Sequence, residues 1–131
     1  MAINVKLLRK IKRHILAKPR CLRMSWWIVT KEDDSEYYTD DYGIRRKFES
    51  CGTAACIAGW AYILSKEKDG YSDVSGTAEK LLNISEWQAM ELFHVNRWPS
   101  EFGIAYKSAA TPAKRARIAA KRIDQFIEEN S

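Results

Sequence analysis

The chain has 131 residues, with 22 Lys and Arg against 17 Asp and Glu, and hydrophobic residues make up 46% of it. This composition excludes global disorder, and because no apolar stretch reaches the roughly 20 residues of a membrane span, we expect neither a membrane segment nor a signal peptide. The three cysteines are an odd number, which favours reduced thiols and a cytoplasmic protein over a disulfide framework.

We expect a single α-helical domain over residues 1–131, and its first element is an amphipathic helix over residues 3–18. Apolar side chains recur at helical spacing in this segment: Leu7, Leu8, Ile11 and Ile15. The other side of the helix carries a stripe of four cations: Lys6, Arg9, Lys10 and Arg13. Pro19 ends the helix, and His14 is expected on its surface.

The segment after this helix predicts a small amount of β-structure. Apolar and polar side chains alternate over residues 22–28, which is typical of a half-buried strand. Residues 31–43 predict a polar loop that carries a small hairpin, and three cations follow it: Arg45, Arg46 and Lys47. We therefore expect a minor β-strand or hairpin near residues 22–48.

Charge is segregated along the first third of the chain. Residues 1–31 contain nine Lys and Arg and no acid, whereas residues 32–41 contain six acids and no base. This separation either steers an acidic ligand toward the protein or lets the acidic segment lie against the basic helix within the molecule.

The sequence CGTAACIAGW, at residues 51–60, begins the predicted central helix, which runs over about residues 52–65 with Ser50 as its candidate N-cap. An apolar run with no polar side indicates a helix buried at the centre of the fold. Within it, Gly59 favours the close approach of another helix, and Trp60 is predicted to fill the core. We assign a structural role to the residues of this motif: Cys51, Gly52, Thr53, Cys56, Gly59 and Trp60.

The cysteines of this motif are also its candidate chemistry. Five positions apart on a helix, Cys51 and Cys56 would leave in directions about 140° apart, which suits neither a zinc pair nor a disulfide. We therefore expect no metal and no cofactor. The positive end of a helix dipole favours a thiolate, so Cys51, with His94 as its base, is a candidate nucleophile beside the structural interpretation.

The second half of the chain predicts a series of helices. Ser85 and Gln88 form a capping box, and Thr111 followed by Pro112 marks a helix start. The predicted helices lie at about residues 78–82, 85–94, 102–110 and 112–128. The expected fold is mainly α, a compact bundle around the central helix.

Several of these features together resemble a family of small bacterial and phage-encoded proteins. They are the basic helix and its proline, Met24 and Trp26, the CGTxxCxAGW core at residues 51–60, Leu92–Phe93, and Trp98–Pro99. That family has no established activity. Many members have His where this chain has Ala55, so the resemblance does not carry His–Cys chemistry over to this chain. The family's presence in phages and mobile elements implies a host-interaction or anti-defence role.

The basic helix is the main candidate for binding, beside the simpler interpretation of a solvated helix face. We assign partner binding to Lys6, Arg9, Lys10, Arg13, Arg45, Arg46 and Lys47, with Arg115, Lys121 and Arg122 as extensions. We expect a non-enzymatic interaction protein whose basic face docks an acidic protein. Two alternatives stay open, a nucleic-acid-binding protein that uses the same face and an enzyme with Cys51 as nucleophile. The sequence does not specify the oligomeric state.

Overall fold

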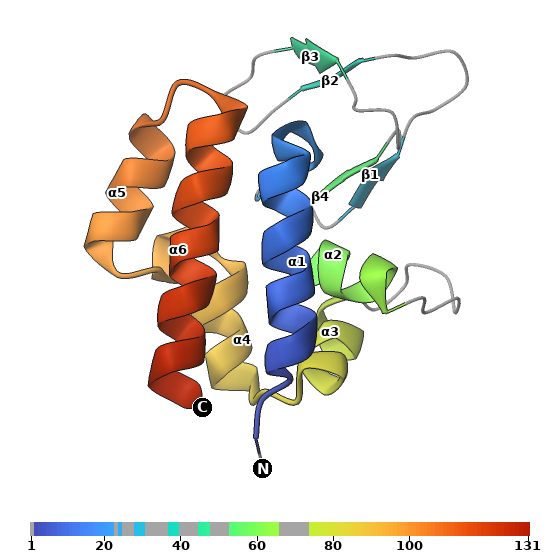
Figure 1. Ribbon diagram of the computed structural model, residues 1–131, viewed down its shortest axis with the longest axis vertical. Helices are drawn as coiled ribbons and strands as arrows, with labels where there is room; N and C mark the ends of the chain where they lie inside the picture. The colour runs from blue at the N-terminus through green and yellow to red at the C-terminus, as the bar shows by residue number, and fades with distance from the viewer. Residues whose placement is uncertain are drawn as a thin grey trace.

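The computed structural model describes residues 2–22, 24, 28–30, 37–39, 45–47, 53–65 and 74–131 (Figure 1). It confirms the predicted helical bundle. The described α-helices are α1 (Val5–Ala17), α2 (Ile57–Leu64), α3 (Val74–Leu82), α4 (Glu86–Phe93), α5 (Ser100–Ser108) and α6 (Pro112–Asn130). Two short 3₁₀ turns accompany them, η1 (Pro19–Cys21) and η2 (Val95–Arg97).

The longest two helices, α1 and α6, lie side by side and run in opposite directions, so that α6 begins near the end of α1 and both chain termini lie at one end of the molecule (Figure 1). Helix α5 covers α6 on the side away from α1 (Figure 1). Pro112 occupies the first turn of α6, and the Thr111 hydroxyl accepts a hydrogen bond from the Lys114 N–H at 3.2 Å, as the sequence predicts.

The start of the central helix differs from the prediction. Residues 53–55 form strand β4 (Thr53–Ala55), which pairs antiparallel with β1 (Ile28–Thr30), and α2 begins only at Ile57. Cys56 is the N-cap, since its Sγ accepts a hydrogen bond from the Gly59 N–H at 3.4 Å. The predicted start at residue 52 is therefore wrong, because pairing with β1 satisfies the backbone groups of this segment in an extended form. Ser50 lies outside the described residues.

The minor β-structure expected near residues 22–48 is present. Strands β2 (Tyr37–Thr39) and β3 (Arg45–Lys47) pair antiparallel, with Tyr38 opposite Arg46. Of the strand predicted over residues 22–28, Leu22 makes an isolated parallel bridge to Ala55 and Ile28 begins the described strand β1, whereas residues 23 and 25–27 lie outside the described residues. Trp26 lies outside the described residues.

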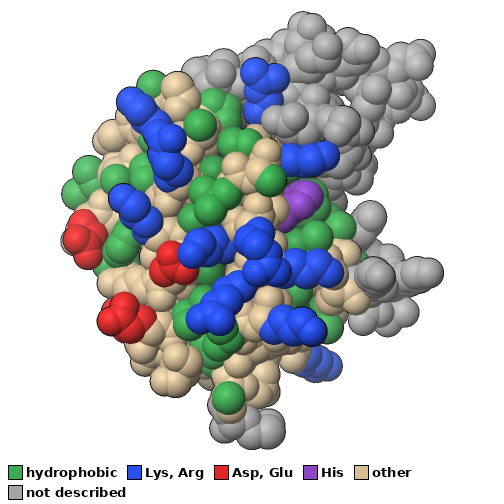
Figure 2. All heavy atoms as spheres, viewed as in Figure 1, with side chains coloured by type: hydrophobic (Ala, Val, Ile, Leu, Met, Phe, Trp, Pro, Cys, Tyr) green, Lys and Arg blue, Asp and Glu red, His purple; other side chains and the backbone are tan. Residues whose placement is uncertain are grey.

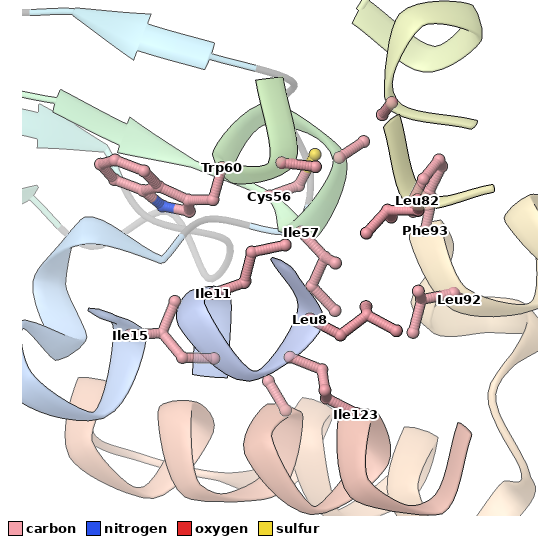
Figure 3. Close-up of a cluster of buried hydrophobic side chains, with 14 of the residues drawn as sticks. Leu8, Ile11, Ile15, Cys56, Ile57, Trp60, Leu82, Leu92, Phe93 and Ile123 are labelled. Atoms are coloured by element: carbon pink, nitrogen blue, oxygen red, sulfur yellow. The ribbon is translucent and has the colours of Figure 1, made fainter. Parts of the chain in front are cut away.

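Helix α2 is buried in the core, as predicted, where it packs beside α1 and α3 (Figure 1). All residues from Ile57 to Tyr62 are buried, and α2 contacts α1, α3 and α4. Figure 3 shows the apolar side chains that meet there. They are Leu8, Ile11 and Ile15 of α1, Ile57 and Trp60 of α2, Leu82 of α3, Leu92 and Phe93 of α4, and Ile123 of α6.

Side-chain caps stabilise the end of the bundle where the two chain termini lie (Figure 1). The Asn4 Oδ1 accepts from the Leu7 N–H at 3.1 Å and its Nδ2 donates to the Leu81 carbonyl at 2.9 Å, which joins the start of α1 to the end of α3. Asn83, at a φ of 55°, adopts the left-handed conformation that asparagine tolerates after a helix. The predicted capping box of α4 is present between Ser85 and Gln88.

Candidate binding surface

The basic stripe predicted on α1 is exposed in the structure. Leu7, Leu8, Ile11 and Ile15 turn into the core, and this places Lys6, Arg9, Lys10 and Arg13 on the outer side of the helix. The Lys10 Nζ donates to the Leu64 carbonyl at the end of α2, at 3.2 Å. Lys6, Arg9 and Arg13 form no hydrogen bond or ion pair with another described residue.

Helix α6 extends this stripe, with other residues than the sequence predicts. Its exposed basic side chains are Lys114, Arg117 and Lys121, spaced three and four residues apart along one face. Arg115 and Arg122 were expected on the surface, but they are only 4% and 2% exposed. Their seven-residue spacing places both on the inner side of the helix, against the rest of the bundle.

An ion pair joins the two basic helices. The Lys12 Nζ lies 2.8 Å from one carboxylate oxygen of Asp124 and 2.9 Å from the other. Because α1 and α6 are antiparallel, this contact places the end of α1 beside the part of α6 that precedes Asp124. Figure 2 shows the resulting face, where Lys and Arg side chains gather over α1 and over the junction between α5 and the start of α6.

The charges of α6 are ordered against its dipole. All five basic residues lie before Ile123, whereas Asp124, Glu128 and Glu129 lie after it. The partial charges at helix ends favour acids in the first turn and bases in the last. The basic residues at the start of α6 are therefore not explained by the stability of the helix itself.

A groove of about 380 Å³ lies between α5 and α6, beside these cations. One wall carries Lys114, Arg117 and Lys121, and no acidic side chain is among the described residues that line the groove. The remaining lining consists of small or apolar residues and a single hydroxyl: Ala105, Ala109, Ala110, Ile118 and Ser108. The groove therefore combines a cationic wall with an apolar floor. The sequence does not predict this groove, although the i, i+3, i+7 spacing of its three cations indicates an exposed basic stripe on the helix.

The remaining predicted binding residues, Arg45, Arg46 and Lys47, form strand β3. Figure 1 shows β3 at the end of the molecule where α1 ends and α6 begins. β3 thus lies near the last turn of α1, whereas Lys6 lies in the first turn of that helix, at the other end of the bundle.

The structure describes only one residue of the candidate catalytic pair. His94 is the exposed residue that ends α4, while Cys51 and Gly52 lie outside the described residues. Cys21 and Cys56 are buried, and neither forms a disulfide with a described residue. Within the described ranges, no group of three His, Cys, Asp or Glu side chains could hold a metal ion.

His14 is not the surface residue that we expected. Its ring lies 4.1 Å from the Trp60 ring, centroid to centroid, and the Trp60 Nε1 donates to the Cys21 carbonyl at 2.7 Å. Burial lowers the pKa of His14, and the nearby charge of Lys18 lowers this pKa further. The neutral imidazole is therefore the form that the fold favours.

This shift predicts a loss of stability in mild acid. The unfolded chain takes up a proton on His14 near its ordinary pKa of about 6.5, whereas the folded chain resists protonation, so the stabilisation is complete above that pH and falls below it. We expect the free energy of unfolding, measured with urea, to fall less between about pH 7.5 and 5.5 in His14→Phe than in the parent chain. An equal fall in both proteins would contradict this assignment.

Comparison with known protein families, with characterised proteins and with solved structures found no match to this chain. Among the described residues, no helix has the length and apolar character that crossing a membrane requires. The described residues form a small helical bundle with a basic face on α1 and α6.

Proposed function

We propose that this chain is a non-enzymatic interaction protein that docks an acidic protein through the basic face of α1 and α6. The observation that carries the proposal is the set of exposed cations on two adjacent helices that have no ion-pair partner among the described residues: Lys6, Arg9, Arg13, Lys114, Arg117 and Lys121. Such a field speeds the approach of an acidic partner and selects against a basic one.

Apolar surface within the basic face favours a protein partner over a nucleic acid. Leu16 is 40% exposed, one helical turn after Arg13. Protein interfaces combine an apolar centre with a polar rim, whereas phosphate contacts need cations alone. The buried thiols of Cys21 and Cys56 support a cytoplasmic location. The host-interaction or anti-defence role implied by the sequence resemblance is part of this proposal.

Charge reversal on α1 tests the docking face. We expect Arg9→Glu with Arg13→Glu to weaken the binding of labelled poly-L-glutamate by about tenfold, since two attractive contacts become repulsive. Fluorescence anisotropy at low and high salt gives the affinity. Lys10 is left unchanged because its Nζ bonds the end of α2.

A matched control separates the face from the net charge. Lys80→Glu with Arg97→Glu makes the same change in charge on α3 and η2, outside the two basic stripes, and should leave the affinity within about twofold. Equal losses in both double variants would contradict a localised docking face. Tighter, steeply salt-dependent binding of duplex DNA or single-stranded RNA in a mobility-shift assay would overturn the protein-partner proposal in favour of nucleic-acid binding.

A further inference from the structure

We propose that the groove between α5 and α6 is the specific seat of the acidic partner, and that it takes a short acidic peptide segment with an aliphatic side chain. The inference rests on the proposed function and places its specificity on α6 rather than α1. The aliphatic side chain would pack against the apolar residues of the groove. The carboxylates on either side of it would pair with Lys114, Arg117 and Lys121.

The charge of the groove favours carboxylates. All three cations stand on one wall, and no acid is among the described lining residues. None of the three is engaged by another described side chain. On α1, by contrast, Lys10 bonds the end of α2 and Lys12 bonds Asp124. The groove is therefore a place on the basic face where three uncompensated cations stand beside apolar surface.

Helix energetics do not account for these cations. Lys114 lies in the first turn of α6, where the helix dipole disfavours positive charge, and Arg117 and Lys121 follow it on the same face. Lys114 acts against the dipole, and no acid among the described lining residues compensates its charge, which costs folding free energy. A bound carboxylate would offset that cost, which makes the charge pattern consistent with an anionic ligand.

The floor of the groove determines the class of ligand. Ala105, Ala109 and Ala110 present only methyl groups, so the backbone of a ligand can approach closely, and Ile118 adds apolar surface. None of the described lining residues is aromatic, so this part of the groove gives nucleic-acid bases no platform on which to stack. The volume of about 380 Å³ lies at the lower end of the range for ligand pockets, which suits a few side chains of a short peptide.

The test uses a fluorescein-labelled peptide of sequence EEDLLEE, and the same peptide with both leucines replaced by serine. We expect the leucine peptide to bind more tightly. We also expect Arg117→Glu with Lys121→Glu to weaken its binding by about tenfold or more, and beyond the effect of Arg9→Glu with Arg13→Glu. Both double variants change the net charge equally, so each controls for the other.

A neutral variant tests the groove without changing charge. Ala105 is exposed, so Ala105→Trp should fold, and its indole would fill the groove and weaken the leucine peptide by about tenfold. Ala113→Trp, on α6 but outside the groove lining, should bind within about twofold of the parent chain. Circular dichroism and thermal unfolding check that each variant retains the fold.

The outcomes separate this inference from the proposed function. If Ala105→Trp binds the leucine peptide normally, or if both peptides bind equally, the groove proposal is overturned. If poly-L-glutamate binding still depends on Arg9 and Arg13 in that case, the proposed docking face on α1 and α6 is retained. If neither double variant weakens either probe, both proposals fail.

Discussion

Trp60→Ala is expected to destabilise the fold by about 3–5 kcal/mol, as large-to-small changes of buried aromatic residues do. Trp60 is 2% exposed, and it joins three elements through the His14 ring, the Cys21 carbonyl and the body of α2. Since small domains are stable by only about 5–15 kcal/mol, the loss is a large share of the total. Urea unfolding followed by far-ultraviolet circular dichroism measures it without relying on tryptophan fluorescence.

Trp87→Ala is the matched control for this change. Trp87 is 63% exposed on α4, so its removal should change the free energy of unfolding by no more than about 0.5 kcal/mol. If Trp60→Ala does not fold, Trp60→Phe keeps one aromatic ring but removes the donor to the Cys21 carbonyl and part of the indole volume, at an expected cost of about 1–3 kcal/mol. Similar unfolding midpoints for Trp60→Phe and the parent chain would show that the hydrogen bond from Trp60 to the Cys21 carbonyl does not stabilise the fold.

Arg122→Ala is expected to cost about 2–3 kcal/mol, because a buried charged donor and its stem would be lost together. The Arg122 guanidinium donates to the Glu91 carbonyl at 3.1 Å and to the Gln125 Oε1 at 3.0 Å, and it lies over the Phe126 ring. Burial lowers the pKa of Arg122, while the charges of Glu129 and Glu91 oppose this change. The side chain thus holds α6 against α4.

Arg117→Ala is the corresponding control on the same helix. Arg117 is exposed, and its replacement should change the free energy of unfolding by no more than about 0.5 kcal/mol. We expect the opposite order for binding of the acidic peptide, which should depend on Arg117. Equal stability losses for the two variants would show that Arg122 is not a structural contact.

The run KRARIAAKR at residues 114–122 shows how far sequence could predict this surface. Its alanines, together with the apolar residues that follow it, indicate one buried face. The sequence also predicts the helix and its start at Thr111–Pro112, because caps and periodicity are local properties. The assignment of Arg115 and Arg122 to the basic face was wrong. A long basic side chain can border a buried face or enter it, and the neighbouring helices decide which.

The central motif at residues 51–60 likewise has some features that follow from the sequence and others that depend on tertiary contacts. The sequence by itself determined that the segment through Trp60 is buried, because an apolar run with no polar side has no stable place at a surface. Only the tertiary structure decided that residues 53–55 are a strand, since β1 supplies their hydrogen bonds from more than twenty positions away. The sequence likewise determined the basic stripe of α1, through its helical spacing. The groove on α6 required the packing of α5, because a site made by two helices is a property of their contact.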